Sequence, residues 1–129
     1  MRVLTLMVMV LAGTASAQDA GRGRDVFVTH CATCHGTSAR GNGPMADVLS
    51  VAPSDLTVLA ATNGGVFPTA RVVQRVDGSR LVLPHGNPMP WWGVILDGPS
   101  SVIVAPDGSE VVASEAIVDV AAWLEEVQR

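Results

Sequence analysis

Hydrophobic residues recur at helical spacing in two segments of the chain, and this periodicity predicts two amphipathic helices. The first covers residues 19–33, where Asp19 is a candidate N-cap. Its periodic positions are Gly23, Val26, Phe27 and His30. The second follows Ser114, another candidate cap. Its apolar stripe consists of Ile117, Val120, Ala121, Leu124 and Val127, with Trp123 at the edge. We therefore expect a largely helical fold.

Prolines and glycines divide the middle of the chain into short elements. Pro68 suits the first turn of a helix that runs through Val76, until Asp-Gly at 77–78 ends it. Residues 102–112 hold two β-branched runs around Pro-Asp-Gly, which predicts a short hairpin. The segment 84–93 has three prolines and two glycines, so it can be neither a regular helix nor a central strand. With 129 residues and no internal repeat, the sequence predicts one domain.

The first 17 residues have the organisation of a secretory signal peptide. Arg2 precedes an apolar run over residues 3–12, and small residues lead to a cleavage position after Ala17. The run is shorter than the about 20 residues that cross a membrane, although an uncleaved amphipathic anchor is the alternative. We therefore expect a signal peptide at 1–17, an exported domain at 18–129 and no transmembrane segment after cleavage.

The exported chain is acidic and contains no lysine. Without Arg2, seven basic residues stand against twelve acidic ones, which gives a net charge of −5. The absence of lysine excludes a Schiff-base lysine and the lysine of a phosphate-binding loop. An acidic chain with no basic cluster does not suit nucleic acid, so we expect no nucleic-acid partner and a positively charged partner surface.

The sequence HCATCHG at 30–36 holds two cysteines and two histidines. A structural zinc site needs four ligands, and the chain has no second cysteine pair. A thioredoxin-like pair should follow a strand and open a helix, whereas this pair ends one. A disulfide here would close a loop too small to add much stability. The spacing Cys31-x-x-Cys34-His35 instead matches a c-type haem attachment site, with both cysteines on the haem vinyl groups and the histidine on the iron.

A second axial ligand should come from elsewhere in the exported chain, and four residues are candidates. His30 should lie on the helix surface, and Met45 is too close to His35 to reach the opposite side of a haem easily. Met89 lies 54 residues after His35, between two prolines that restrict the backbone of a ligand loop. We therefore favour Met89, with His85 in the same loop as its rival.

Several short motifs together resemble those of a known protein family. They are Gly23-x-x-x-Phe27, CATCH at 31–35, GNGP at 41–44, DLT at 55–57, Met89-Pro90 and VAAWL in the last helix. With them the sequence resembles the class I, single-haem bacterial cytochromes c over nearly the whole exported chain. The resemblance implies an all-α cytochrome c fold, in which three to five helices surround one covalent haem c. The first and last helices should cross closely, with contacts from Gly23, Phe27, Val120 and Trp123.

The resemblance also implies roles for individual residues around the haem. Pro44 should offer its carbonyl to the Nδ1–H of His35, which would fix the imidazole tautomer. Arg71 could approach a haem propionate or could equally be a solvated helix residue. One of Trp91 and Trp92 should meet a propionate through its indole N–H, and the other should be core. The expected haem site therefore includes Pro44, Arg71 and Trp91 besides the attachment motif and Met89.

A haem iron with histidine and methionine ligands has no open position for a substrate, but it can change its oxidation state. We therefore expect a periplasmic one-electron carrier of moderately high potential, not an enzyme. It should be a monomer that forms transient complexes with redox proteins, membrane-bound respiratory complexes among them. One alternative is a haem-c subunit of a larger respiratory or dehydrogenase complex, docked through the long stretch 99–113. The other is a haem enzyme or gas sensor with an open sixth site.

Overall fold

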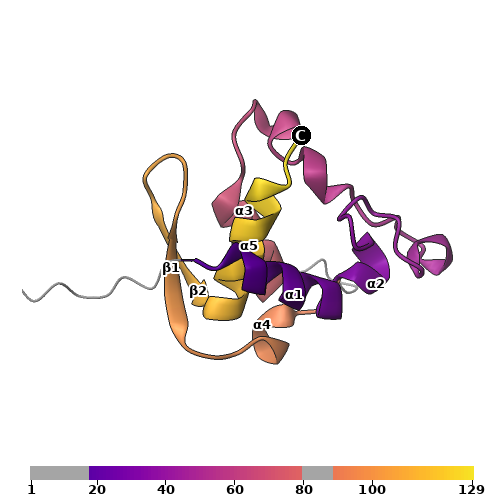
Figure 1. Ribbon diagram of the computed structural model, residues 1–129, viewed down its shortest axis with the longest axis horizontal. Coiled ribbons are helices and arrows are strands. Elements are labelled where there is room, and N and C mark those ends of the chain that lie inside the picture. The colour runs from indigo at the N-terminus through magenta and orange to yellow at the C-terminus, as the bar shows by residue number, and fades with distance from the viewer. Residues whose placement is uncertain (1–17, 80–88) are drawn as a thin grey trace, which may run out of the picture.

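The computed structural model describes residues 18–79 and 89–129, in which helices predominate and two strands form an antiparallel pair (Figure 1). The elements are α1 (Ala20–His30), α2 (Ala32–His35), the 3₁₀ turns η1 (Ala46–Val48), η2 (Leu56–Val58) and η3 (Ala61–Asn63), α3 (Thr69–Asp77), α4 (Trp92–Ile95), β1 (Ser100–Val104), β2 (Glu110–Ser114) and α5 (Glu115–Glu126). The helical fold class and the hairpin are both confirmed. None of the described helices is long and apolar enough to cross a membrane. The expected signal peptide lies outside the described residues.

The predicted first and last helices, α1 and α5, cross at close range (Figure 1). A Cβ atom added to Gly23 of α1 would collide with the carbonyl group of Asp119 in α5, so only glycine fits at the crossing. One turn further along α1, the ring of Phe27 lies against Trp123, with 4.6 Å between the ring centroids. Both rings are buried, including that of Trp123, which the sequence placed at the edge of the stripe. The close crossing expected at Gly23 is therefore confirmed.

A buried carboxylate joins the same two helices at the beginning of α1. Asp119 is 2% exposed, and its Oδ1 accepts a hydrogen bond from the backbone N–H of Asp19 at 2.8 Å. Its Oδ2 accepts a hydrogen bond from Nε of Arg22, with which it forms an ion pair. Asp19 caps α1 by accepting from the N–H of Arg22, as predicted. Without its partner, the buried carboxylate of Asp119 would be left uncompensated. The pair therefore fixes the position along α5 at which α1 begins.

The first helix ends earlier than the side-chain pattern predicts. It stops at His30, and Cys31 (φ −111°, ψ −29°) separates it from α2. The N–H of Cys31 bonds to the carbonyl of Phe27, and the N–H of His35 bonds to the carbonyl of Cys31. The backbone therefore continues its hydrogen bonding through the change of direction, which is why the apolar periodicity does not reveal it.

α3 and the hairpin follow the predicted boundaries closely. α3 comes directly after Pro68 and ends where Gly78 takes the left-handed conformation (φ +84°). In the hairpin, Val102 pairs with Val112, and the neighbouring Ile103 is buried in the core. The turn residues and the alternation of the strands therefore contain enough information to place both elements.

The start of α5 is capped differently from the prediction. Ser114 precedes the helix, as expected, but its hydroxyl makes no capping hydrogen bond. Its Oγ is buried and has no hydrogen-bond partner within the described part of the chain. The N–H of Glu115 instead bonds to the carbonyl of Pro99 at 2.9 Å. The backbone that leads into β1 therefore satisfies the first turn of α5.

The crossing predicts a position-specific response to alanine in α1. Gly23→Ala should lower the free energy of unfolding by about 1–3 kcal/mol, because the new methyl group has to displace the backbone of α5. Gly21→Ala is the matched control, since it gains the same helix propensity of about 1 kcal/mol. Its Cβ would meet only a side-chain oxygen of Asp19, at 3.2 Å. Urea unfolding measures both variants, and equal stabilities would contradict a backbone-to-backbone contact at Gly23.

Candidate functional site

A cavity of about 510 Å³ lies beside the crossing of α1 and α5. Its described lining comes from α1, α2, the segment 49–59, α3, the residues around Met89 and α5. The lining residues with polar or metal-binding side chains are His30, Cys31, Cys34, His35, Ser54, Arg71, Arg75 and Met89. Most of the others are aliphatic or aromatic. The fold therefore brings the attachment motif and Met89, far apart in the sequence, to one apolar cavity.

The attachment motif forms one helical turn at the wall of this cavity. The N–H groups of Cys34 and His35 both bond to the carbonyl of Cys31, at 3.2 and 2.9 Å. The two cysteines are not joined by a disulfide, and both line the cavity. Burial, and to a smaller extent the neighbouring Cys34, raises the pKa of the Cys31 thiol to about 11. A redox-active dithiol needs the opposite shift, so this turn does not suit thiol–disulfide exchange.

His35 is held by one of its two ring nitrogens. Its Nδ1 lies 3.1 Å from the carbonyl oxygen of Ser54, a contact that places the proton on Nδ1. Burial lowers the pKa of His35, and the Ser54 carbonyl opposes this shift only in part. Burial therefore favours the neutral imidazole, with Nε2 as the unprotonated nitrogen. That is the form in which a histidine binds a metal ion.

The carbonyl that orients His35 belongs to Ser54 and not to Pro44, the residue expected from the sequence. Pro44 is exposed and does not line the cavity. The N–H groups on either side of it bond to backbone carbonyls of α2 at 3.0 Å. A Cβ atom at the preceding Gly43 would collide with the same backbone. The Pro44 segment therefore packs on the outer side of the attachment turn. The hydrogen bond to His35 comes from the segment at Ser54.

Met89 lines the cavity and packs against the core, where it is partly buried. Met45 is 41% exposed beside η1 and is absent from the described lining. His85 lies outside the described residues, so the choice of Met89 over His85 stays a prediction. His30, expected on the helix surface, instead lines the cavity.

Two arginines of α3 lie at the cavity. Arg71 and Arg75 are one helical turn apart, and both are exposed to solvent while they contribute to the lining. No aspartate or glutamate is among the described lining residues, although the whole chain has a net charge of −4. Arg71 is therefore both exposed and part of the lining, so its contact with a propionate stays a prediction, and the spacing of four residues could have indicated Arg75 as well. The two guanidinium groups at the edge of the cavity suit a bound group that carries carboxylates.

Of the two neighbouring tryptophans, Trp92 lines the cavity and Trp91 does not. Trp91 is 51% exposed, and its side chain lies over Gly78 at the end of α3. Because α4 begins at Trp92, the two side chains leave the backbone in different directions. Among the described residues, Trp92 therefore lies at the cavity and Trp91 lies outside its lining, and contact of either indole with a propionate stays a prediction.

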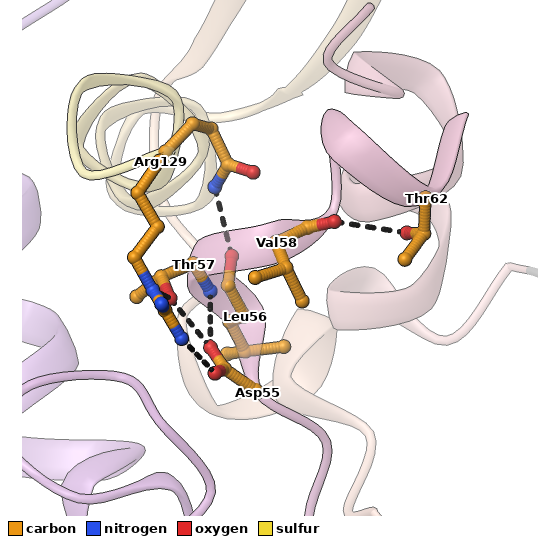
Figure 2. A network of polar contacts seen from close by, with 7 residues as sticks. Asp55, Leu56, Thr57, Val58, Thr62 and Arg129 are labelled. Atoms are coloured by element: carbon orange, nitrogen blue, oxygen red, sulfur yellow. Dashed lines mark hydrogen bonds and ion pairs between the residues drawn. The ribbon is translucent and has the colours of Figure 1, made fainter. Parts of the chain in front are cut away.

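A polar network ties one wall of the cavity to the residues that follow α5 (Figure 2). Oδ1 of Asp55 accepts hydrogen bonds from the N–H and the hydroxyl of Thr57, at 2.8 and 2.6 Å. The guanidinium of Arg129 donates to Asp55 at 2.9 Å and to Thr57 at 2.8 Å. Nε2 of Gln128 donates to the carbonyl of Leu56 at 2.8 Å. Because Leu56 lines the cavity, these bonds fix the position of that wall.

The residues around the cavity fit a covalently bound haem. Two thiols on one helical turn can each form a thioether bond, and a neutral imidazole follows them directly. The same cavity contains the sulfur of Met89, apolar walls for a macrocycle and two guanidinium groups for its carboxylates. This set of side chains combines covalent attachment, iron ligation and burial in one place.

The chain was compared with models of protein families. The family model described as Cytochrome c matches residues 20–92, more than half of the chain. The matched segment runs from the first residue of α1 to Trp92 and includes the attachment motif and Met89. The hairpin and α5 lie beyond it. No curated protein and no solved structure matches the chain.

The network at Asp55 predicts an acid-sensitive contribution to stability. Hydrogen bonds from Thr57, with a smaller contribution from Arg129, lower the pKa of Asp55. The folded chain therefore takes up this proton less readily than the unfolded chain. The stabilisation is complete above the ordinary carboxyl pKa and is lost as the pH falls through the lowered value.

Asp55→Asn should accordingly lower the urea midpoint at pH 7. The difference in urea midpoint between this variant and wild type should shrink as the pH falls from about 5 to about 2. Asp47→Asn is the control, since Asp47 is an exposed carboxylate of η1 outside the network. A difference between Asp55→Asn and wild type that stays constant over this pH range would contradict the ionised pair.

Proposed function

The chain belongs to the cytochrome c family, and we propose that it is an electron carrier with one haem c attached at Cys31 and Cys34 and with His35 and Met89 as axial ligands. The observation that carries the proposal is that His35 and Met89 line one cavity together with both cysteines. Met89 also lies directly before Pro90, which restricts the backbone beside the ligand. With both axial positions held by side chains, the iron has no free site for a substrate, so we propose a carrier and not an enzyme.

The side chains around the cavity set the properties of this centre. When bound, the haem supplies an iron that exchanges one electron between its ferric and ferrous states. The Ser54 carbonyl keeps His35 in one tautomer, and a methionine sulfur gives a higher potential than a second imidazole would. Apolar walls such as Phe27 and Leu124 exclude water and disfavour the extra positive charge of the ferric state. The proposed carrier therefore has a moderately high potential.

We also assign the two arginines of α3 to the haem propionates. Arg71 and Arg75 supply two positive charges at a cavity whose described lining has no acidic residue. Two propionate carboxylates would match both the number and the sign of these charges. The arginines would then hold the polar edge of the haem at the surface.

We propose that the protein works in the periplasm, as the signal peptide expected at 1–17 implies. Its redox partners should be proteins, among them membrane-bound respiratory complexes, that meet it in small and transient contacts. The charge of −5 expected after cleavage favours partners with a positively charged surface.

A second candidate function is a haem-c subunit of a larger complex. One observation favours it: the hairpin lies outside the segment that matches the family, and its valines Val102, Val104 and Val112 are exposed. Size-exclusion chromatography of the protein from its native source distinguishes the two functions. Elution as a monomer supports the free carrier, whereas elution at a constant ratio with other chains supports the subunit.

The proposed ligand predicts a change in the absorption spectrum of the oxidised protein. A histidine–methionine haem has a weak band near the red edge of the visible range, and Met89→Ala should abolish it. Met45→Ala is the matched control and should leave the band in place, because Met45 is exposed and outside the described lining. His85→Ala tests the rival ligand. Persistence of the band in Met89→Ala would exclude Met89 as the ligand.

The proposed charge complementarity predicts salt-dependent electron transfer. With a positively charged redox protein, the second-order rate constant should fall on the order of 10-fold as the salt rises from about 10 mM to about 0.5 M. A small neutral reductant is the control and should react at a constant rate. Stopped-flow absorption measures both, and a salt-independent rate with the protein partner would argue against electrostatic steering.

A further inference from the structure

His30 and Trp92 meet at the edge of the cavity. Their ring centroids are 5.6 Å apart with 60° between the ring planes, an edge-on contact within the range that aromatic pairs prefer. His30 is the last residue of α1 and directly precedes Cys31, whereas Trp92 is the first residue of α4. Both line the cavity. The contact therefore joins the attachment side of the site to the segment that carries Met89.

Trp92 is coupled to Met89 by a short and restricted stretch of chain. The two residues are three positions apart, which limits their separation to about 10 Å even in an extended chain, and Pro90 lies between them. α4 is anchored on its other side as well, because a Cβ atom at Gly93 would collide with the carbonyl of Asp77 in α3. His30 thus adds an aromatic contact between this anchored segment and α1.

We propose that His30 is a positioning residue, which through Trp92 holds the Met89 segment closed over the haem. This inference rests on the proposed ligation by Met89. His30 need not touch the iron in this role, because the aromatic contact acts on the backbone that presents the sulfur. The imidazole also sits where solvent would enter if α4 moved away from α1, since it lines the cavity and is itself partly exposed.

Opening of the Met89 segment gives the proposal a measurable consequence. An external ligand can bind the ferric iron only when the methionine sulfur has left, so its apparent affinity scales with the fraction of open molecules. In this account, opening separates the two rings of the His30–Trp92 pair. Removing the contact should increase the open fraction, and with it the apparent affinity, by about 2- to 10-fold.

The test is an absorption titration of the oxidised holoprotein with imidazole. His30→Ala should raise the apparent affinity by this factor, and His30→Phe, which keeps a ring against Trp92, should restore a value close to wild type. Val28→Ala is the control, because Val28 is on the same helix, exposed and outside the described lining. Adding His30→Ala to a Trp92→Ala background should have no further effect. If Trp92→Ala does not fold, the comparison of His30→Ala with His30→Phe decides.

The outcomes separate this inference from the proposed function beneath it. If wild type shows the methionine band and His30→Ala binds imidazole no more tightly than Val28→Ala, the positioning role is overturned and the ligation by Met89 stands. If His30→Phe raises the apparent affinity for imidazole as much as His30→Ala does, the positioning role is also overturned. In that case an aromatic ring against Trp92 would have no effect on the opening of the segment. Absence of the methionine band from wild type overturns both proposals.

Discussion

The contact between Gly23 and the backbone of α5 at Asp119 is the constraint on which the rest of the structure depends. It sets the distance between the two longest described helices, and the buried Asp119–Arg22 pair fixes where along α5 the first helix begins. α1 leads directly into the attachment turn, and α5 contributes Val120 and Leu124 to the cavity. The position of the attachment turn relative to that wall therefore follows from one close helix crossing.

The functional groups of the site come from both helices and loops. Helices hold the covalent attachment and the arginines at the rim, whereas loop segments supply the carbonyl of Ser54 and the sulfur of Met89. Burial raises the pKa of Cys31 and lowers that of His35, so it favours the neutral form of both side chains. Ionised groups stand instead at the edges, in Arg71 and in the network of Asp55 with Arg129. This separation keeps the walls of the cavity largely apolar, which would favour the ferrous state of the proposed haem.

Much of the fold could be predicted from side-chain periodicity, whereas the missed details depend on the backbone. The stripes of α1 and α5 and the turn residues of the hairpin are local signals, and the structure agrees with them. Ser54 escaped prediction because it acts through its carbonyl oxygen, which every residue has. The choice between Trp91 and Trp92 depends on the residue at which α4 begins, and neither side chain indicates that boundary. The parts of this site that depend on backbone atoms far apart in the sequence could therefore not be predicted from its side chains.

In the proposed site Met89 lies over the haem, and one proton NMR spectrum of the reduced protein tests this placement most directly. With the expected signal peptide at 1–17 removed, the chain has two methionines, Met45 and Met89, so labelling the methionine methyl groups should give two signals. A methyl group held over the face of a haem is shifted strongly upfield by the ring current. We predict one strongly shifted signal, assigned to Met89, and one ordinary signal from Met45. Two signals at ordinary positions, or a shifted signal from Met45, would contradict it.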